Sequence, residues 1–110
     1  MADKKPTADE KLIGRCAMSA FRLGALHARD LIDDKTADRL FSALNAFDTV
    51  LTAQSKLHFS ASGSENEALE KALEKPIRHL RQAFVRKVDA ACRKVDKTKL
   101  TARERAKLQL

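Results

Sequence analysis

Apolar residues recur at steps of three and four along the first third of the chain. A helix has about 3.6 residues per turn, so this spacing gathers them on one side and predicts a helix from residue 7 to about 32. Thr7 and Glu10 have the spacing of a capping box, in which each side chain bonds a free amide at a helix start. The apolar positions are Leu12, Ile13, Cys16, Ala17, Ala20, Phe21, Gly24, Ala28 and Leu31.

A second helical pattern follows the polar cluster at residues 33–36. It predicts a helix over about 36–58, ended by the Ser-Ala-Ser-Gly-Ser stretch at 60–64, which is the clearest linker in the chain. The residues expected on its inner side are Ala37, Leu40, Phe41, Leu44, Phe47 and Leu51.

The third pattern starts at Ser64, which forms a second capping box with Glu67, and is interrupted by Pro76. Proline lacks an amide hydrogen and clashes with the preceding turn, so Pro76 should kink this helix or begin a new one. The apolar pattern then resumes at Ile77, Leu80, Phe84, Val88, Ala91 and Val95. A last capping box, Thr101 with Glu104, predicts a short helix near the C-terminus.

Together these patterns predict an all-α fold: a small antiparallel bundle of three to five helices with a kink or break at Pro76. Residues 1–6 are expected to form a flexible tail, 7–98 the bundle and 99–110 a short C-terminal helix or tail. The composition agrees, since 110 residues make one small domain and the chain holds only three Gly and two Pro.

Nothing in the sequence indicates secretion, a membrane span or a metal site. The N-terminus lacks the apolar core of a signal peptide, and no run approaches the ~18 apolar residues of a span, so we expect a cytoplasmic protein with no membrane partner. Cys16 and Cys92 lie on apolar faces without a CxxC motif, as buried free thiols do; a disulfide would need an oxidising compartment. His27, His58 and His79 lie on separate segments and form no ligand cluster.

Catalytic signatures are also missing. The chain has no glycine-rich phosphate loop, no nucleophile elbow and no paired catalytic carboxylates, so we expect no enzyme, no cofactor and no small-molecule substrate. Two charged residues do fall on apolar sides, Asp48 on the second helix and Arg81 after Pro76. An unpaired charge there would be costly, which predicts an ion pair between them, or between Asp48 and His27.

Charge is distributed unevenly along the chain. The net charge is +7, yet residues 1–74 hold ten basic and twelve acidic side chains. Residues 75–110 hold twelve basic and only three acidic side chains, so the whole excess belongs to the C-terminal third. Such a concentration indicates an anionic partner.

Helical spacing sorts these cations into rows. His79, Arg86, Arg93 and Lys97 fall opposite the apolar side after Pro76, with Lys87 and Lys94 flanking them, and a weaker row runs along the first helix. A solvated helix face would show the same row of cations, so the pattern fits both a solvated face and a surface that binds nucleic acid. Without Trp or Tyr, binding would go through the backbone with little sequence preference. The candidate nucleic-acid-binding residues are Arg86, Arg93, Lys97, Lys87, Lys94, His79, Arg15, Arg22 and Arg29.

The outer side of the second helix is unusually poor in charge, which is typical of interface centres and also of a merely neutral surface. A protein interface is therefore predicted at Ser42, Asn45, Ala46, Thr49 and Ala53. The first helix has a seam of small residues suited to close packing, inside the bundle or against a second copy: Ala17, Ala20, Gly24 and Ala28.

The sequence thus favours a non-enzymatic, basic helical accessory protein that binds nucleic-acid backbone as a small subunit of a larger nucleoprotein complex. In size, charge and helicity it is similar to the small helical subunits of CRISPR effector complexes and to plasmid and phage accessory proteins, although no motif identifies either group. The alternative is an adaptor or inhibitor whose basic face docks an acidic protein. Attachment to a membrane surface is disfavoured, since interfacial Trp and Tyr are absent.

Overall fold

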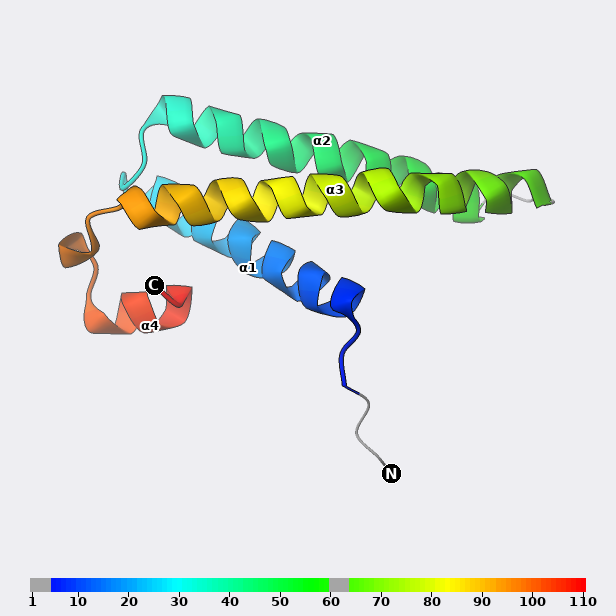
Figure 1. The fold of residues 1–110 in the computed structure, drawn as a ribbon. Coiled ribbons are helices and arrows are strands. Elements are labelled where there is room, and N and C mark those ends of the chain that lie inside the picture. The colour runs from blue at the N-terminus through cyan, green and yellow to red at the C-terminus, as the bar shows by residue number, and fades with distance from the viewer. Residues whose placement is uncertain (1–4, 60–63) are drawn as a thin grey trace.

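The computed structural model describes residues 5–59 and 64–110, which contain four α-helices, one 3₁₀ turn and no strand. The all-α class predicted from the sequence is confirmed (Figure 1). The elements are α1 (Ala8–Ala28), α2 (Asp34–Phe59), α3 (Ser64–Lys94), the 3₁₀ turn Lys97–Lys99 and α4 (Ala102–Leu108).

The helices form a flat arrangement rather than a round bundle. α2 and α3 run antiparallel and side by side, while α1 packs chiefly on α3 and splays away toward its N-terminus (Figure 1). The short helix α4 packs on α1. The Cα atoms span 55 × 42 × 18 Å, so most side chains lie close to a surface.

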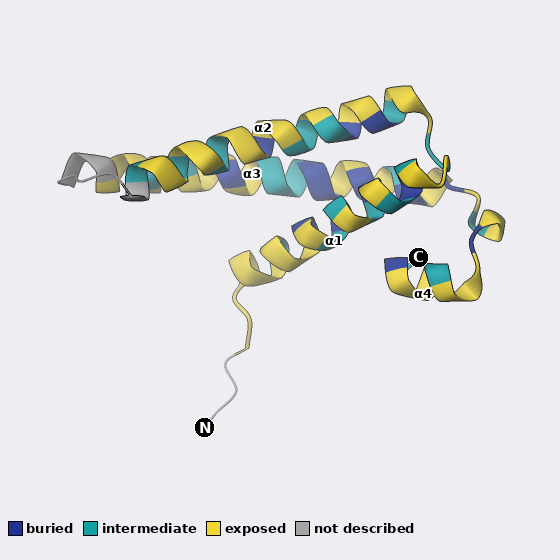
Figure 2. Cartoon of the chain, turned by 180° about the vertical axis from the view of Figure 1, so that it is seen from behind, coloured by how far each residue is buried: buried dark blue, intermediate teal, exposed yellow. Residues whose placement is uncertain are grey.

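The core follows the predicted inner sides of α2 and α3. Phe84 and Val88 are fully buried, and Leu80 and Ala91 are partly buried beside them. Figure 2 shows the buried residues along the sides of the helices that face one another. The other core members include Leu23, Leu26, Leu40, Phe47, Ile77, Val85, Val95, Leu100 and Leu108.

The expectation that Phe21 belongs to the core is wrong, because this residue is 54% exposed. α1 buries Cys16, Ser19, Leu23 and Leu26 instead. Apolar residues surround most of α1, but a helix at the edge of a flat layer has neighbours on one side only. The opposite side is left to solvent, and Figure 2 shows the N-terminal half of α1 as mostly exposed.

A break at Pro76, one of the two alternatives for this residue, does not occur: α3 continues through it from Ser64 to Lys94. Pro76 removes one backbone hydrogen bond, the one that would reach the carbonyl of Ala72. Both residues are exposed, so water can solvate the freed carbonyl, and the inner side of α3 packs against α2 regardless.

The helix starts use the predicted polar residues with small shifts in position. The Thr7 side chain accepts a hydrogen bond from the Glu10 amide at 3.1 Å. α2 begins at residue 34 rather than 36, because Asp33 accepts from the Thr36 amide at 2.6 Å. The capping box predicted at Ser64 and most of the linker at 60–64 lie outside the described side chains. The box of Thr101 with Glu104 is complete and opens α4.

Both cysteines are free and buried, as predicted. Burial raises the pKa of the Cys16 and Cys92 thiols, which disfavours the reactive thiolate. We expect both to react with Ellman's reagent roughly 100-fold more slowly in the native protein than in urea, because reaction requires local opening. Stopped-flow absorbance measures both rates, and equal rates in the two states would contradict the burial of these thiols.

Candidate nucleic-acid interface

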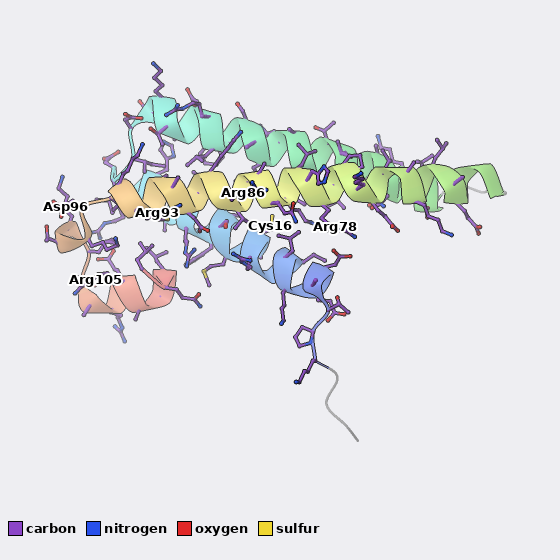
Figure 3. The ribbon with its side chains drawn as sticks, in the orientation of Figure 1. Cys16, Arg78, Arg86, Arg93, Asp96 and Arg105 are labelled. Atoms are coloured by element: carbon purple, nitrogen blue, oxygen red, sulfur yellow. The ribbon has the colours of Figure 1, made fainter. Side chains whose placement is uncertain are left out.

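Four exposed cations flank Ala90 on the solvent side of α3. Arg86 and Arg93 lie on one side of this alanine (Figure 3), and Lys87 and Lys94 on the other. Each pair is seven residues apart, which corresponds to about 10.5 Å along a helix. The prediction that these four side chains are exposed is confirmed, and we call this surface the α3 cationic face.

A groove of about 690 Å³ lies between α2 and α3 next to this face. Lys87 and Lys94 form its α3 wall, and Arg39 contributes a third cation from α2. Arg39 was not among the predicted binding residues, although helical spacing places it at one end of the charge-poor side of α2. The remaining lining residues are Thr36, Asp38, Leu40, Ser42, Ala43, Ala46, Ala90 and Ala91.

The groove also brings together two surfaces that the sequence treated separately. Ser42 and Ala46, predicted for a protein interface, line it together with the cations of α3. The other residues predicted for that interface are exposed on α2: Asn45, Thr49 and Ala53.

Asp89 is the one acidic residue between positions 75 and 95, and it is neutralised from another helix. Its Oδ1 lies 3.4 Å from Nη1 of Arg22 on α1. On α3 it stands three residues after Arg86 and four before Arg93, the spacing of intrahelical ion pairs. Among the described side chains, Arg86 and Arg93 have no ion pair of their own, although Arg93 Nε donates to the Asp89 carbonyl at 3.4 Å.

The cationic row of α1 does not join the α3 cationic face, because two of its members hold the C-terminal segment. Arg22 Nε donates to the Leu108 carbonyl at 2.6 Å, and Nη2 donates to the Gln109 carbonyl at 3.2 Å. Arg29 lies 2.9 Å from Glu104 and donates to the Lys99 carbonyl. Of the three candidates on α1, Arg15 alone is exposed without a described ion pair.

The two remaining candidates are His79, in the middle of α3, and Lys97, in the 3₁₀ turn that follows this helix. His79 is exposed one seven-residue step before Arg86. Lys97 falls beyond the last residue of α3 and is half-buried in the 3₁₀ turn, so it does not continue the helical row. It shares a shallow hollow of about 470 Å³ with Arg93.

The predicted ion pairs of Asp48 do not form. Asp48 is exposed and has no ion pair with either Arg81 or His27. An exposed carboxylate is solvated by water and needs no partner. Arg81 instead places its guanidinium 5.0 Å from the centre of the Phe47 ring, a cation–π contact. His27 lies 3.7 Å from Asp34.

Other carboxylates are held ionised at helix and turn starts. Hydrogen bonds from Thr36 lower the pKa of Asp33, and hydrogen bonds from Thr98 lower that of Asp96. The Thr101 amide does the same for Glu104, with a contribution from the nearby Arg29. None of these three acids belongs to α3, although Asp33 interacts with Arg39 of the groove.

The described side chains contain no group of three or more His, Cys, Asp or Glu residues arranged to hold a metal ion. None of the helices in this part of the chain combines the length and the apolar character needed to cross a bilayer.

No protein-family model, no curated protein and no solved structure matches this chain.

Proposed function

We propose that the α3 cationic face and the adjoining groove bind the phosphate backbone of a nucleic acid with little sequence preference. One observation carries the proposal: four exposed cations stand together on α3, and the acid between them on that helix, Asp89, is bound by Arg22. Asp38 on α2 is then the carboxylate beside them in the groove, against the three cations Arg39, Lys87 and Lys94. A solvated helix face usually mixes both signs of charge, and this one does not.

The spacing of the cations suits a regular polyanion. The about 10.5 Å between Arg86 and Arg93, or between Lys87 and Lys94, equals the rise along the duplex axis of about three phosphates of one B-DNA strand. Base stacking has no support on this surface, since Phe84 is buried and the chain has no Trp or Tyr. Contacts to phosphates alone carry no sequence information, hence the weak sequence preference.

The proposal includes an accessory role. A chain of 110 residues with no assigned catalytic step fits a small subunit of a larger nucleoprotein complex in the cytoplasm. The neutral, exposed α2 residues Asn45, Thr49 and Ala53 lie on the same side of this helix as Ser42 and Ala46, which line the groove, and offer a place for a protein subunit.

Salt dependence tests the binding mode. Five phosphate contacts, from the α3 cationic face and Arg39, would give log K against log salt a slope of about −4.5 on duplex DNA. Fluorescence anisotropy with a 30-base-pair duplex, a single strand and an RNA, between 50 and 200 mM salt, measures it. An absence of binding to all three at 50 mM would reject the proposal.

A double charge reversal tests the location. Arg86→Glu with Arg93→Glu should weaken binding by roughly 100-fold at 50 mM salt, since two attractive contacts become repulsive. The matched control is Lys56→Glu with Arg103→Glu, which changes the net charge equally at exposed positions on α2 and α4. Circular dichroism checks that helicity is retained. Equal losses in both double variants would show that total charge, and not the α3 cationic face, drives binding.

A second candidate function is docking of an acidic protein in the same groove. The apolar lining residues Leu40, Ala43 and Ala91 favour it, since they can pack against a protein side chain but offer a phosphate neither charge nor hydrogen bonds. Two results together would favour this function over the first. The chain would bind an acidic protein but no nucleic acid, and the double variant Lys87→Glu with Lys94→Glu would abolish that binding.

A further inference from the structure

The side of α1 that faces away from the other helices is apolar and uncovered. Three large hydrophobic residues are exposed among the described residues, and two of them, Ile13 at 47% and Phe21 at 54%, lie on this side. They are eight residues apart, about 12 Å along the helix. The third, Leu69 at 52%, lies on α3.

Beyond Glu10 in the first turn, the rest of this side is made of small residues, so a second helix could approach closely. Nothing lies within 4 Å of a Cβ built on Gly14 or Gly24. Ala17 and Ala28 are exposed between and beyond them. We call the surface formed by Ile13, Gly14, Ala17, Phe21, Gly24 and Ala28 the outer face of α1.

One edge of the outer face is basic. Lys11 and Arg15 are exposed there without a described ion pair. Arg22, on the same edge, binds the last carbonyls of α4, so α4 lies along it. α4, which packs on α1, carries three exposed cations of its own: Arg103, Arg105 and Lys107 (Arg105 in Figure 3).

The other edge has little charge to offer. Asp9 is held by Arg78 through two hydrogen bonds of 2.9 and 3.1 Å. His27 packs edge-on against the Phe41 ring. Charge on the flanks of the outer face is thus largely positive and unbalanced.

We propose that the outer face of α1 binds an amphipathic helix of another protein, one whose apolar stripe is flanked by Asp and Glu residues. The stripe would cover Ile13 and Phe21, and the acids would meet Lys11, Arg15 and α4. This site is independent of the proposed nucleic-acid interface: α1 and the groove contact opposite sides of α3.

A second copy of the chain fits this face less well. Antiparallel pairing about a two-fold axis would bring the two basic edges against each other. Parallel pairing would bring each basic edge against the edge where Asp9 is already engaged by Arg78. In either orientation the copy supplies one exposed carboxylate on the face, Glu10, against several cations. Like charges across an interface disfavour it.

The test uses two designed peptides of 21 residues, both with leucines at helical spacing, flanked by Glu in one and by Lys in the other. Isothermal titration calorimetry with the full chain should give a dissociation constant below about 100 µM for the Glu peptide and at least roughly tenfold weaker binding of the Lys peptide. Phe21→Ser should weaken Glu-peptide binding at least roughly tenfold. Leu69→Ser, at an equally exposed leucine on α3, should leave it unchanged.

Several results would overturn the proposal. One is a dissociation constant above about 100 µM for the Glu peptide, or equal binding of both peptides. Another is a loss with Lys87→Glu and Lys94→Glu but not with Phe21→Ser, which would move the peptide to the groove. Sedimentation equilibrium provides the last: a dimer of the chain alone that Phe21→Ser dissociates would make a second copy the occupant.

Discussion

Replacing Phe84 with alanine is expected to lower the free energy of unfolding by about 3–5 kcal/mol. The Phe84 ring is fully buried on α3, at the centre of the core that joins the three long helices. The cost combines the lost burial with the cavity that rigid neighbouring helices leave behind. Domains of this size are stable by about 5–15 kcal/mol in all, so the variant should lose a large share of its stability.

Phe21→Ala is the matched control, since the same side chain is removed from a position that is 54% exposed. It should change stability by less than about 1 kcal/mol. Urea unfolding followed by circular dichroism measures both variants. Similar losses for the two phenylalanines would contradict the assignment of Phe84 to the core and of Phe21 to the surface.

Replacing Arg22 with methionine is expected to loosen α4 by about 2–4 kcal/mol, since it removes charged hydrogen bonds to two carbonyls and the ion pair with Asp89. The Arg22 side chain is only 15% exposed, so water replaces these partners poorly. α4 has seven residues, fewer than the ~12–15 that an isolated helix needs, and therefore depends on its docking.

Hydrogen exchange measured by NMR gives this result residue by residue. Amides of α4 should lose protection in Arg22→Met while those at the centre of α3 keep theirs. Arg15→Met, which removes an exposed cation from the same helix, should leave both helices as protected as in the natural chain. Unchanged protection of α4 in Arg22→Met would show that Leu108 packing alone holds it.

The helices were predictable because their signals are local. Thr7 and Thr101 cap helices as their sequence neighbours indicated, and Phe84 and Val88 are buried as the three- and four-residue spacing predicted. Pro76 was harder to interpret, because whether its lost hydrogen bond breaks a helix depends on solvent access and on packing against α2. Neither is encoded within a few residues.

The errors arose where the answer depends on which helices meet. Helical spacing places Phe21 beside other apolar residues of α1, but it does not show that α1 has neighbours on one side only. Asp48 appeared to need a partner because helical spacing placed it on the apolar side of α2, whereas the position is exposed.

The candidate site was predictable in part for the same reason. The exposure of Arg86, Arg93, Lys87 and Lys94 follows from helical geometry within one element. The groove does not, since Arg39 comes from α2 and reaches these lysines only through the antiparallel pairing with α3. The internal contacts of Arg22 connect residues far apart in sequence and leave no local signal.

The contact between Arg22 and Asp89 has a further consequence under the proposed function. The two carbonyls hold the Arg22 guanidinium in place and α4 shields it from water. When α4 detaches, the pair with Asp89 is exposed to solvent screening and weakens, and Asp89 can pair with Arg93 on its own helix. Docking of α4 would then favour polyanion binding, and by thermodynamic reciprocity a bound polyanion would favour docking of α4 by the same factor. The docking of α4 and the binding of a polyanion to α3 would thus be coupled through the guanidinium of Arg22.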